Sequence, residues 1–308
     1  MSSIGGPPPL PKLPVWDVVG LAYSNYFRNF VDVLRASWLW VMLTAVLVGI
    51  MSWQQWSLMG AVIANSINHG PFPPAFDLSS FGTLSFIIVG ANLVLILATV
   101  SIAVAWHRRV ILGEQPAFGG LNFASRSFWR YIGIGLAIGG LAFLPMFSVL
   151  VPVFIILANA AKGYKGVLAG VVFLLAIAAY VAAIAIVLRL SMLLPARAAG
   201  VDLSFAQSWS RTRGNCWRIF WGGAICTLAP MMVAEIALLP FGFPDPKTMI
   251  AAGPNAIPAF FASGDFALGM TAISTVFTAY YLLTLPIGIG FLSYSYRHFF
   301  REAISPAL

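Results

Sequence analysis

The chain has 308 residues, of which 60% are hydrophobic and only 8% are charged, and its formal net charge is +8. Soluble domains usually carry about 25% charged residues, so this composition excludes an ordinary water-soluble protein and predicts that lipid covers much of the molecule. The basic excess does not indicate nucleic acid as a partner, because the Lys and Arg residues cluster at the ends of apolar segments rather than along one face.

The first 14 residues are predicted to form a flexible, proline-rich tail. Their run GGPPPLPKLP lacks the basic start and apolar core of a secretory signal and favours an extended, polyproline-like conformation. In residues 15–34 the apolar side chains recur at a spacing near 3.6, while Asp17, Asn25, Arg28 and Asp32 belong to the opposite face. This pattern predicts an amphipathic helix in the plane of the lipid headgroups.

Six apolar stretches are long enough to cross a bilayer, which takes about 20 helical residues. Asp202, between the fourth and fifth stretches, is expected to cap another amphipathic helix that runs to about Arg213. We therefore predict an all-α, polytopic membrane helical bundle of about six transmembrane helices, with amphipathic interfacial helices on the cytoplasmic side, as one domain over residues 15–308. The predicted spans are residues 36–56, 84–106, 131–158, 167–188, 219–239 and 268–292.

A weak internal repeat divides this domain into three units, residues 15–114, 115–200 and 201–302. Each unit begins with an aromatic, basic segment (FRNFVDVLRASWLW, FASRSFWRYIG and SWSRTRGNCWRIFWG) and ends with a basic one (AWHRRVILGE, VLRLSMLLPAR and SYSYRHFFRE). Three copies of an interfacial helix followed by a transmembrane hairpin would produce this pattern. The alternative is that Arg and Trp gather at every inner membrane boundary without any repeat.

The distribution of basic residues predicts the orientation. If the six stretches span the membrane, 14 of the 17 Lys and Arg residues lie on one side, and only Lys162, Lys165 and Lys247 lie on the other. Because positive charge is retained in the cytoplasm, we expect both termini to be cytoplasmic.

Ionisable groups inside a membrane are rare and mark functional sites, and this chain has almost none. Glu235 is the one carboxylate within a predicted span, and it is either a proton or cation site or a solvated carboxylate at the outer rim. Asn92 is expected to form an interhelical hydrogen bond. Tyr280 and Tyr281 belong to the most polar span, which should face protein or a cavity. His107 lies between Trp106 and Arg108 and is expected at the lipid phosphates.

No motif of an enzyme, a metal site or a cofactor occurs, so we expect a non-enzymatic protein without cofactors. Cys216 and Cys226 are separated by about 15 Å of helix rise, which excludes a disulfide within that helix.

Residues 194–220, LPARAAGVDLSFAQSWSRTRGNCWRIF, resemble a segment of a broad bacterial group. The group comprises the membrane domain of some glycerophosphodiester phosphodiesterases and related six-helix inner-membrane proteins. AWHRRVILGE at residues 105–114 is similar to the end of their second span. The resemblance implies a six-helix bundle in the bacterial cytoplasmic membrane; the sequence contains no phosphodiesterase catalytic domain, so that activity is not implied. The matching residues are Ala206, Ser208, Trp209, Arg213, Gly214, Asn215, Trp217, Arg218 and Phe220.

Our first hypothesis is an integral membrane scaffold or accessory subunit that organises lipids or a larger membrane complex. Its partners would be membrane lipids and other membrane protein subunits. It depends on the amphipathic segments, on the shortage of charge within the spans, and on GxxxG motifs such as Gly135 and Gly139 that allow close helix contact. The alternative is a transporter or channel for a lipid-like or small neutral solute, which would use the sixth span, Asn92 and Glu235. A membrane enzyme acting on lipids is the third hypothesis.

Overall fold

The computed structural model describes residues 11–69, 78–121, 123–159, 167–242, 253 and 256–301. These residues contain no strand, and six of their helices are long and apolar enough to cross a membrane. The chain is therefore an all-α, multi-pass membrane protein, as predicted. In chain order the elements are α1 (Val15–Arg28), α2 (Phe30–His69), α3 (Leu78–Leu112), the 3-10 turn η1 (Phe118–Gly120), α4 (Arg126–Asn159), α5 (Val167–Leu190), α6 (Leu193–Ala198), α7 (Phe205–Arg211), α8 (Cys216–Gly242), α10 (Ala256–Ala262) and α11 (Gly264–Phe299).

The six spans of the structure agree with the predicted spans in number and in approximate position along the chain, but they differ in length. Helix α2 has 40 residues, about 60 Å at 1.5 Å per residue, which is twice the thickness of the hydrocarbon layer. Hydropathy identifies the part of a helix that lipid covers and not the turns that continue beyond it. The six spans are Phe30–Gly60, Ser85–Leu112, Arg126–Phe147, Leu174–Ala198, Cys216–Leu238 and Gly264–Phe299.

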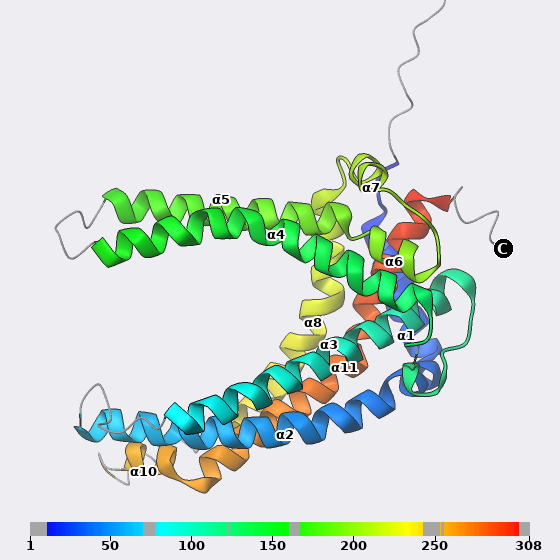
Figure 1. The fold of residues 1–308 in the computed structure, drawn as a ribbon. Coiled ribbons are helices and arrows are strands. Elements are labelled where there is room, and N and C mark those ends of the chain that lie inside the picture. The colour runs from blue at the N-terminus through cyan, green and yellow to red at the C-terminus, as the bar shows by residue number, and fades with distance from the viewer. Residues whose placement is uncertain are drawn as a thin grey trace, which may run out of the picture.

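The helices form two arms that diverge from a common end (Figure 1). Helices α2, α3, α10 and α11 pack together in one arm, and α4 and α5 form the other as a hairpin. Helix α8 runs between them, packs mainly on α11 and makes a smaller contact with α5. The short helices α1, α6 and α7 gather at the common end (Figure 1).

Most of the tightly packed core lies at this common end, which we call the inner end because it carries the arginine-rich ends of the spans. Its largest fully buried side chains include Trp106 of α3, Phe128 of α4, Ile219 of α8 and Phe291 of α11. The helices approach closely here: a Cβ atom at Gly222 would lie 2.3 Å from the ring of Phe291. The inner end therefore holds the two arms together.

The structure corrects both predicted amphipathic helices. The helix that begins at Val15 ends at Arg28, so residues 30–34 belong to the first transmembrane helix, and its apolar face is buried against α11 and α8 rather than in lipid. Helix α7 is capped by Ser204, which exchanges two hydrogen bonds with Gln207 in a capping box, and not by Asp202. Asp202 instead pairs with Arg197 and, at 3.5 Å, with Arg130.

Candidate functional site

The six residues singled out from the sequence do not form one site. Glu235 is exposed on α8, Asn92 is exposed on α3, and Arg213 is exposed after α7. Trp217 is also exposed and stacks on Phe220, with ring centroids 5.1 Å apart. Tyr280 and Tyr281 are half-buried on α11, the helix that packs against α2, α8, α3 and α1. Of the two surroundings expected for the sixth span, protein or a cavity, the helix contacts of α11 show protein.

The polar groups within the spans are largely satisfied by their own helices. The Asn92 amide donates to the Ile88 carbonyl at 2.8 Å, one turn earlier in α3, so the predicted interhelical bond is wrong. On α11, the hydroxyls of Ser274, Thr278 and Thr284 each donate to the carbonyl four residues before them. These hydroxyls therefore do not present a row of free donors to a solute.

Asn215 anchors the beginning of the described chain to α8. Its side-chain oxygen accepts from the Leu13 amide at 2.9 Å, and its side-chain nitrogen donates to the Pro11 carbonyl at 3.2 Å. Arg218, one turn into α8, donates to the Leu13 carbonyl at 2.8 Å. The end of the proline-rich segment is thus part of the folded structure, with Leu13 fully buried, whereas residues 1–10 lie outside the described residues.

The side chain of Tyr23 links α1 to α8 by a hydrogen bond. The Tyr23 hydroxyl donates to the Ile225 carbonyl at 3.0 Å. Burial raises the pKa of Tyr23 above its ordinary value, with smaller contributions from Cys226 and Tyr280. The hydroxyl therefore stays protonated and able to donate near neutral pH.

Helix α7 and the residue after it bind the end of α5 through side-chain hydrogen bonds and a cation–π contact. The hydroxyls of Ser208 and Thr212 donate to the Arg189 carbonyl at 2.7 and 3.3 Å, and the Arg189 guanidinium lies 3.6 Å from the centre of the Trp209 ring. Such carbonyls at a helix end have no partner within their own helix. The segment SWSRT, residues 208–212, thus has a structural role here, as a cap on α5.

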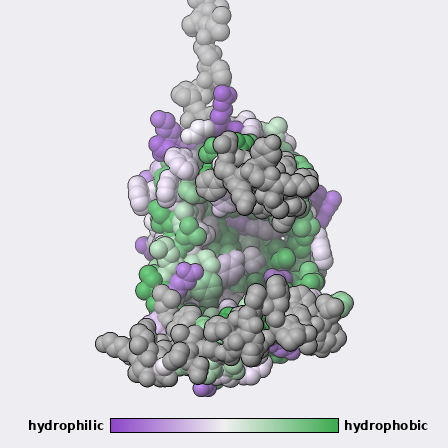
Figure 2. Space-filling view, turned by 90° about the vertical axis from the view of Figure 1, so that its left-hand side faces the viewer, coloured by the Kyte–Doolittle hydropathy of each residue, from purple (hydrophilic) through white to green (hydrophobic). Residues whose placement is uncertain are grey.

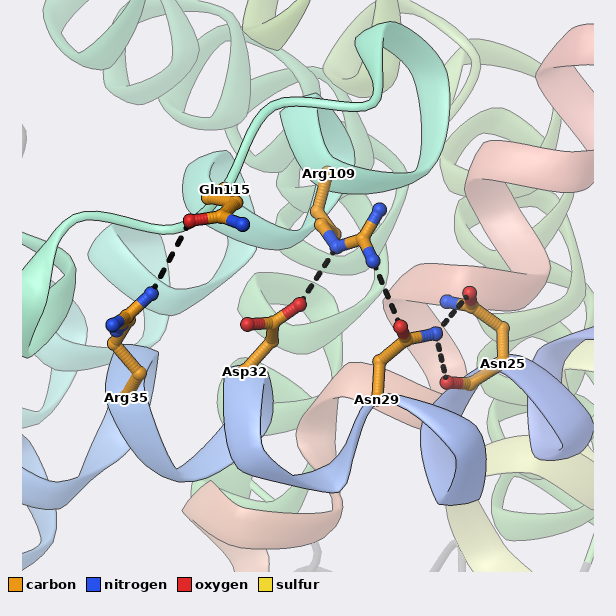
Figure 3. Close-up of polar contacts among 6 residues, drawn as sticks. All are labelled: Asn25, Asn29, Asp32, Arg35, Arg109 and Gln115. Carbon is orange, nitrogen blue, oxygen red and sulfur yellow. Dashed lines mark hydrogen bonds and ion pairs between the residues drawn. The ribbon is translucent and has the colours of Figure 1, made fainter.

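Arg109 joins α3 to the bend between α1 and α2 (Figure 3). Its Nε lies 2.9 Å from Asp32 Oδ2, and its Nη2 donates to Asn29 Oδ1 at 2.8 Å. Asn29, where the helix is interrupted, donates in turn to the backbone and side-chain oxygens of Asn25, both at 2.9 Å. The bend is therefore fixed by a network of polar side chains from three helices.

His107 is fully buried and does not reach the lipid phosphates, so its predicted position is wrong. Its Nδ1 lies 2.7 Å from the Ser293 hydroxyl of α11, and its Nε2 lies 3.5 Å from the Tyr131 hydroxyl of α4. The Ser293 hydroxyl donates to the Ile289 carbonyl at 2.9 Å, so it accepts from His107 and lacks the arrangement of an activated nucleophile, and both side chains are enclosed by the core. The trio therefore links α3, α4 and α11 and is closed to a substrate.

Helix α4 carries the least covered of the six described spans. Only 11% of the residues in the most apolar window of α4 are buried, whereas the share is 28–33% in the other five spans. A Cβ atom added at Gly135 or Gly139 would meet nothing within 4 Å, so this GxxxG motif makes no close helix contact here. Viewed toward the open ends of the arms, the surface is hollowed between them, and the hollow is mostly hydrophobic (Figure 2).

Among the described residues, no three His, Cys, Asp or Glu side chains form a group that could bind a metal ion. Comparisons with protein-family models, with characterised proteins and with solved structures find no match. The resemblance of residues 194–220 to the bacterial group therefore stays a prediction.

Sequence reasoning did not predict the contacts that organise the inner end, which are made by Asn215, Arg189, Arg109 and His107. The only signal for Asn215 is its place in the RGNCWR motif, directly after Gly214, whose φ of 76° favours glycine.

Proposed function

We propose that this protein is a non-enzymatic membrane scaffold or accessory subunit, whose splayed α4–α5 hairpin contacts lipid acyl chains or a transmembrane helix of a partner subunit. The observation that carries the proposal is the 11% burial of the apolar window of α4. A transmembrane helix that packs so little on its own bundle presents most of its surface to other molecules of the membrane.

The exposed surface of α4 carries a stripe of large apolar side chains. Leu136, Gly140, Phe143 and Phe147 are exposed at spacings of four and three, which places them on one stripe of the helix. Large apolar side chains beside a small residue form the kind of surface on which acyl chains and neighbouring helices pack.

A transporter for a lipid-like or small neutral solute is the second candidate, and the hydrophobic hollow between the arms supports it (Figure 2). The hydroxyls of α11 count against a polar pathway, because Ser274, Thr278 and Thr284 donate within their own helix. If the chain transports a solute, Glu235→Gln and Asn92→Ala should alter flux into reconstituted vesicles. Unchanged flux would remove both residues from a pathway.

Native mass spectrometry after gentle detergent extraction tests the scaffold proposal. We expect the chain to retain phospholipid, or a second membrane subunit, in a fixed ratio. The double variant Leu136→Ala and Phe143→Ala should reduce that retention. The matched control is Met42→Ala with Val46→Ala on α2, whose side chains are exposed to a similar extent. A wild-type monomer free of both lipid and protein would overturn the proposal.

We further propose a bacterial cytoplasmic membrane with both termini in the cytoplasm, on the strength of the basic residues at the inner end. The residues expected on the outer side, Lys162, Lys165 and Lys247, lie outside the described residues. Reporter fusions at Lys247 and Leu308 should be active on opposite sides of the membrane, and activity of both in the cytoplasm would contradict this orientation.

A further inference from the structure

An open cavity of about 390 Å³, most of whose lining residues are exposed, lies on the surface of the inner end, where the beginning of α1 meets the beginning of α8. Five residues line the cavity: Pro14, Val15, Trp16, Asp17 and Arg218.

The wall of this cavity is fixed by the hydrogen bonds that join Asn215 and Arg218 to the backbone of Leu13. Arg218 uses one nitrogen, Nη1, to hold the Leu13 carbonyl, while Asn215 holds the Leu13 amide. Within the described part of the chain, the remaining guanidinium donors of Arg218 have no hydrogen-bond partner. Arg218 is therefore positioned by the fold and still has donors available for an anion.

The cavity also carries a negative charge, that of Asp17 in the first turn of α1. Asp17 forms no ion pair and no side-chain hydrogen bond with any residue in the described ranges, and its carboxylate is not within 4 Å of the Arg218 guanidinium. One cation and one anion thus line the same space without neutralising each other. A zwitterion with separated charges is the ligand that matches both.

The surroundings place this cavity at the level of the lipid headgroups. Trp16 is 74% exposed, and Trp217 and Trp221, on the first turns of α8, are 67% and 53% exposed. Tryptophan is enriched at membrane–water interfaces, where its ring lies in the apolar layer and its N–H in the polar one. The cavity therefore opens where phospholipid phosphates and amines are present at high local concentration.

We propose that the cavity binds the headgroup of phosphatidylethanolamine, with the phosphate at Arg218 and the ammonium at Asp17. A primary ammonium has three donors for a carboxylate, whereas the quaternary ammonium of choline has none and is usually bound by a cage of aromatic rings. This inference rests on the proposed function and deepens it, because it names the lipid class that the scaffold binds at its inner end.

The experiment uses the full chain in phosphatidylcholine nanodiscs that contain equal small fractions of phosphatidylethanolamine and phosphatidylglycerol. Lipids retained by the protein are identified by native mass spectrometry. We expect phosphatidylethanolamine to be enriched about tenfold over its bulk fraction, the factor that corresponds to about one hydrogen bond to a charged group. Asp17→Asn should abolish this enrichment, and Asp17→Lys should shift it to phosphatidylglycerol.

Asp17 is the informative position because it has no partner in the described structure, whereas replacing Arg218 would also release Leu13. Asp265→Asn is the matched control, since Asp265 is likewise an exposed acid in the first turn of a helix, α11. Unchanged enrichment in Asp17→Asn would overturn the inference, and so would displacement of the lipid by millimolar inorganic phosphate. Wild-type protein that retains lipids without preference would refute this inference alone, whereas retention of neither lipid nor partner would refute the proposed function as well.

Discussion

Replacing Asn215 by Ala should release the beginning of the folded chain from α8. Asn215 is 2% exposed and Leu13 is fully buried, so the hydrogen bond between them is buried, and the bond from Asn215 to the Pro11 carbonyl is partly buried. Each such bond contributes about 1 kcal/mol, and a buried amide left without a partner costs about 1–3 kcal/mol. We therefore expect the local opening free energy of the segment to fall by about 2–3 kcal/mol.

Hydrogen exchange with mass spectrometry in nanodiscs measures this change directly. Residues 11–14 have the sequence PKLP, and because proline has no amide hydrogen, only Lys12 and Leu13 report exchange. A loss of about 2–3 kcal/mol corresponds to an exchange rate roughly 30 to 150 times faster at Leu13. Arg213→Ala is the control, because Arg213 is exposed and lies two residues before Asn215. If Leu13 exchanged equally fast in wild type and Asn215→Ala, the anchor would not exist.

Three further perturbations test the inner end and the outer rim. Arg109→Gln should lower stability against unfolding in sodium dodecyl sulfate by about 1–3 kcal/mol, because its partner Asp32 is mostly buried; equal stability would contradict the network in Figure 3. Ser208→Ala combined with Thr212→Val should broaden spin-label distances between the two arms, since both hydroxyls hold the end of α5; an unchanged distribution would refute this role. Glu235→Gln should leave lipid retention unchanged, because Glu235 lies on α8 and not on the α4–α5 hairpin that we propose to contact lipid; loss of retention would make it a binding residue.

The number and place of the spans could be predicted because hydrocarbon imposes a strict rule. A chain in lipid must satisfy its backbone hydrogen bonds within each segment, so a long apolar stretch such as residues 84–106 has no option except a helix. The prediction fails at the ends of the helices, where water and headgroups remove this constraint. Helix α2 accordingly extends to His69, well beyond the predicted residue 56.

The organising polar residues could not be predicted because their partners are distant in sequence. His107 and Ser293 are 186 residues apart, and Leu13 and Asn215 are 202 apart. A histidine beside Trp106 and Arg108 has the sequence neighbours of an interfacial residue, and only the packing of α11 against α3 buries it. The prediction for Asn92 failed for the opposite reason, since its partner, the Ile88 carbonyl, lies one turn away in its own helix.

The position of the α4–α5 hairpin follows from the same balance between lipid and polar contacts. In water, the uncovered apolar face of α4 would be costly, at about 25 cal/mol per Å², and would drive the hairpin onto the bundle. Lipid tails are as apolar as leucine, so this force is absent in a membrane, and close packing and polar bonds decide which helices associate. In the hairpin those contacts lie at the inner end, at His107 with Tyr131 and at Arg189 with Ser208. The inner end therefore determines where the hairpin leaves the bundle, and the surface beyond it is left for lipid or a partner helix to cover.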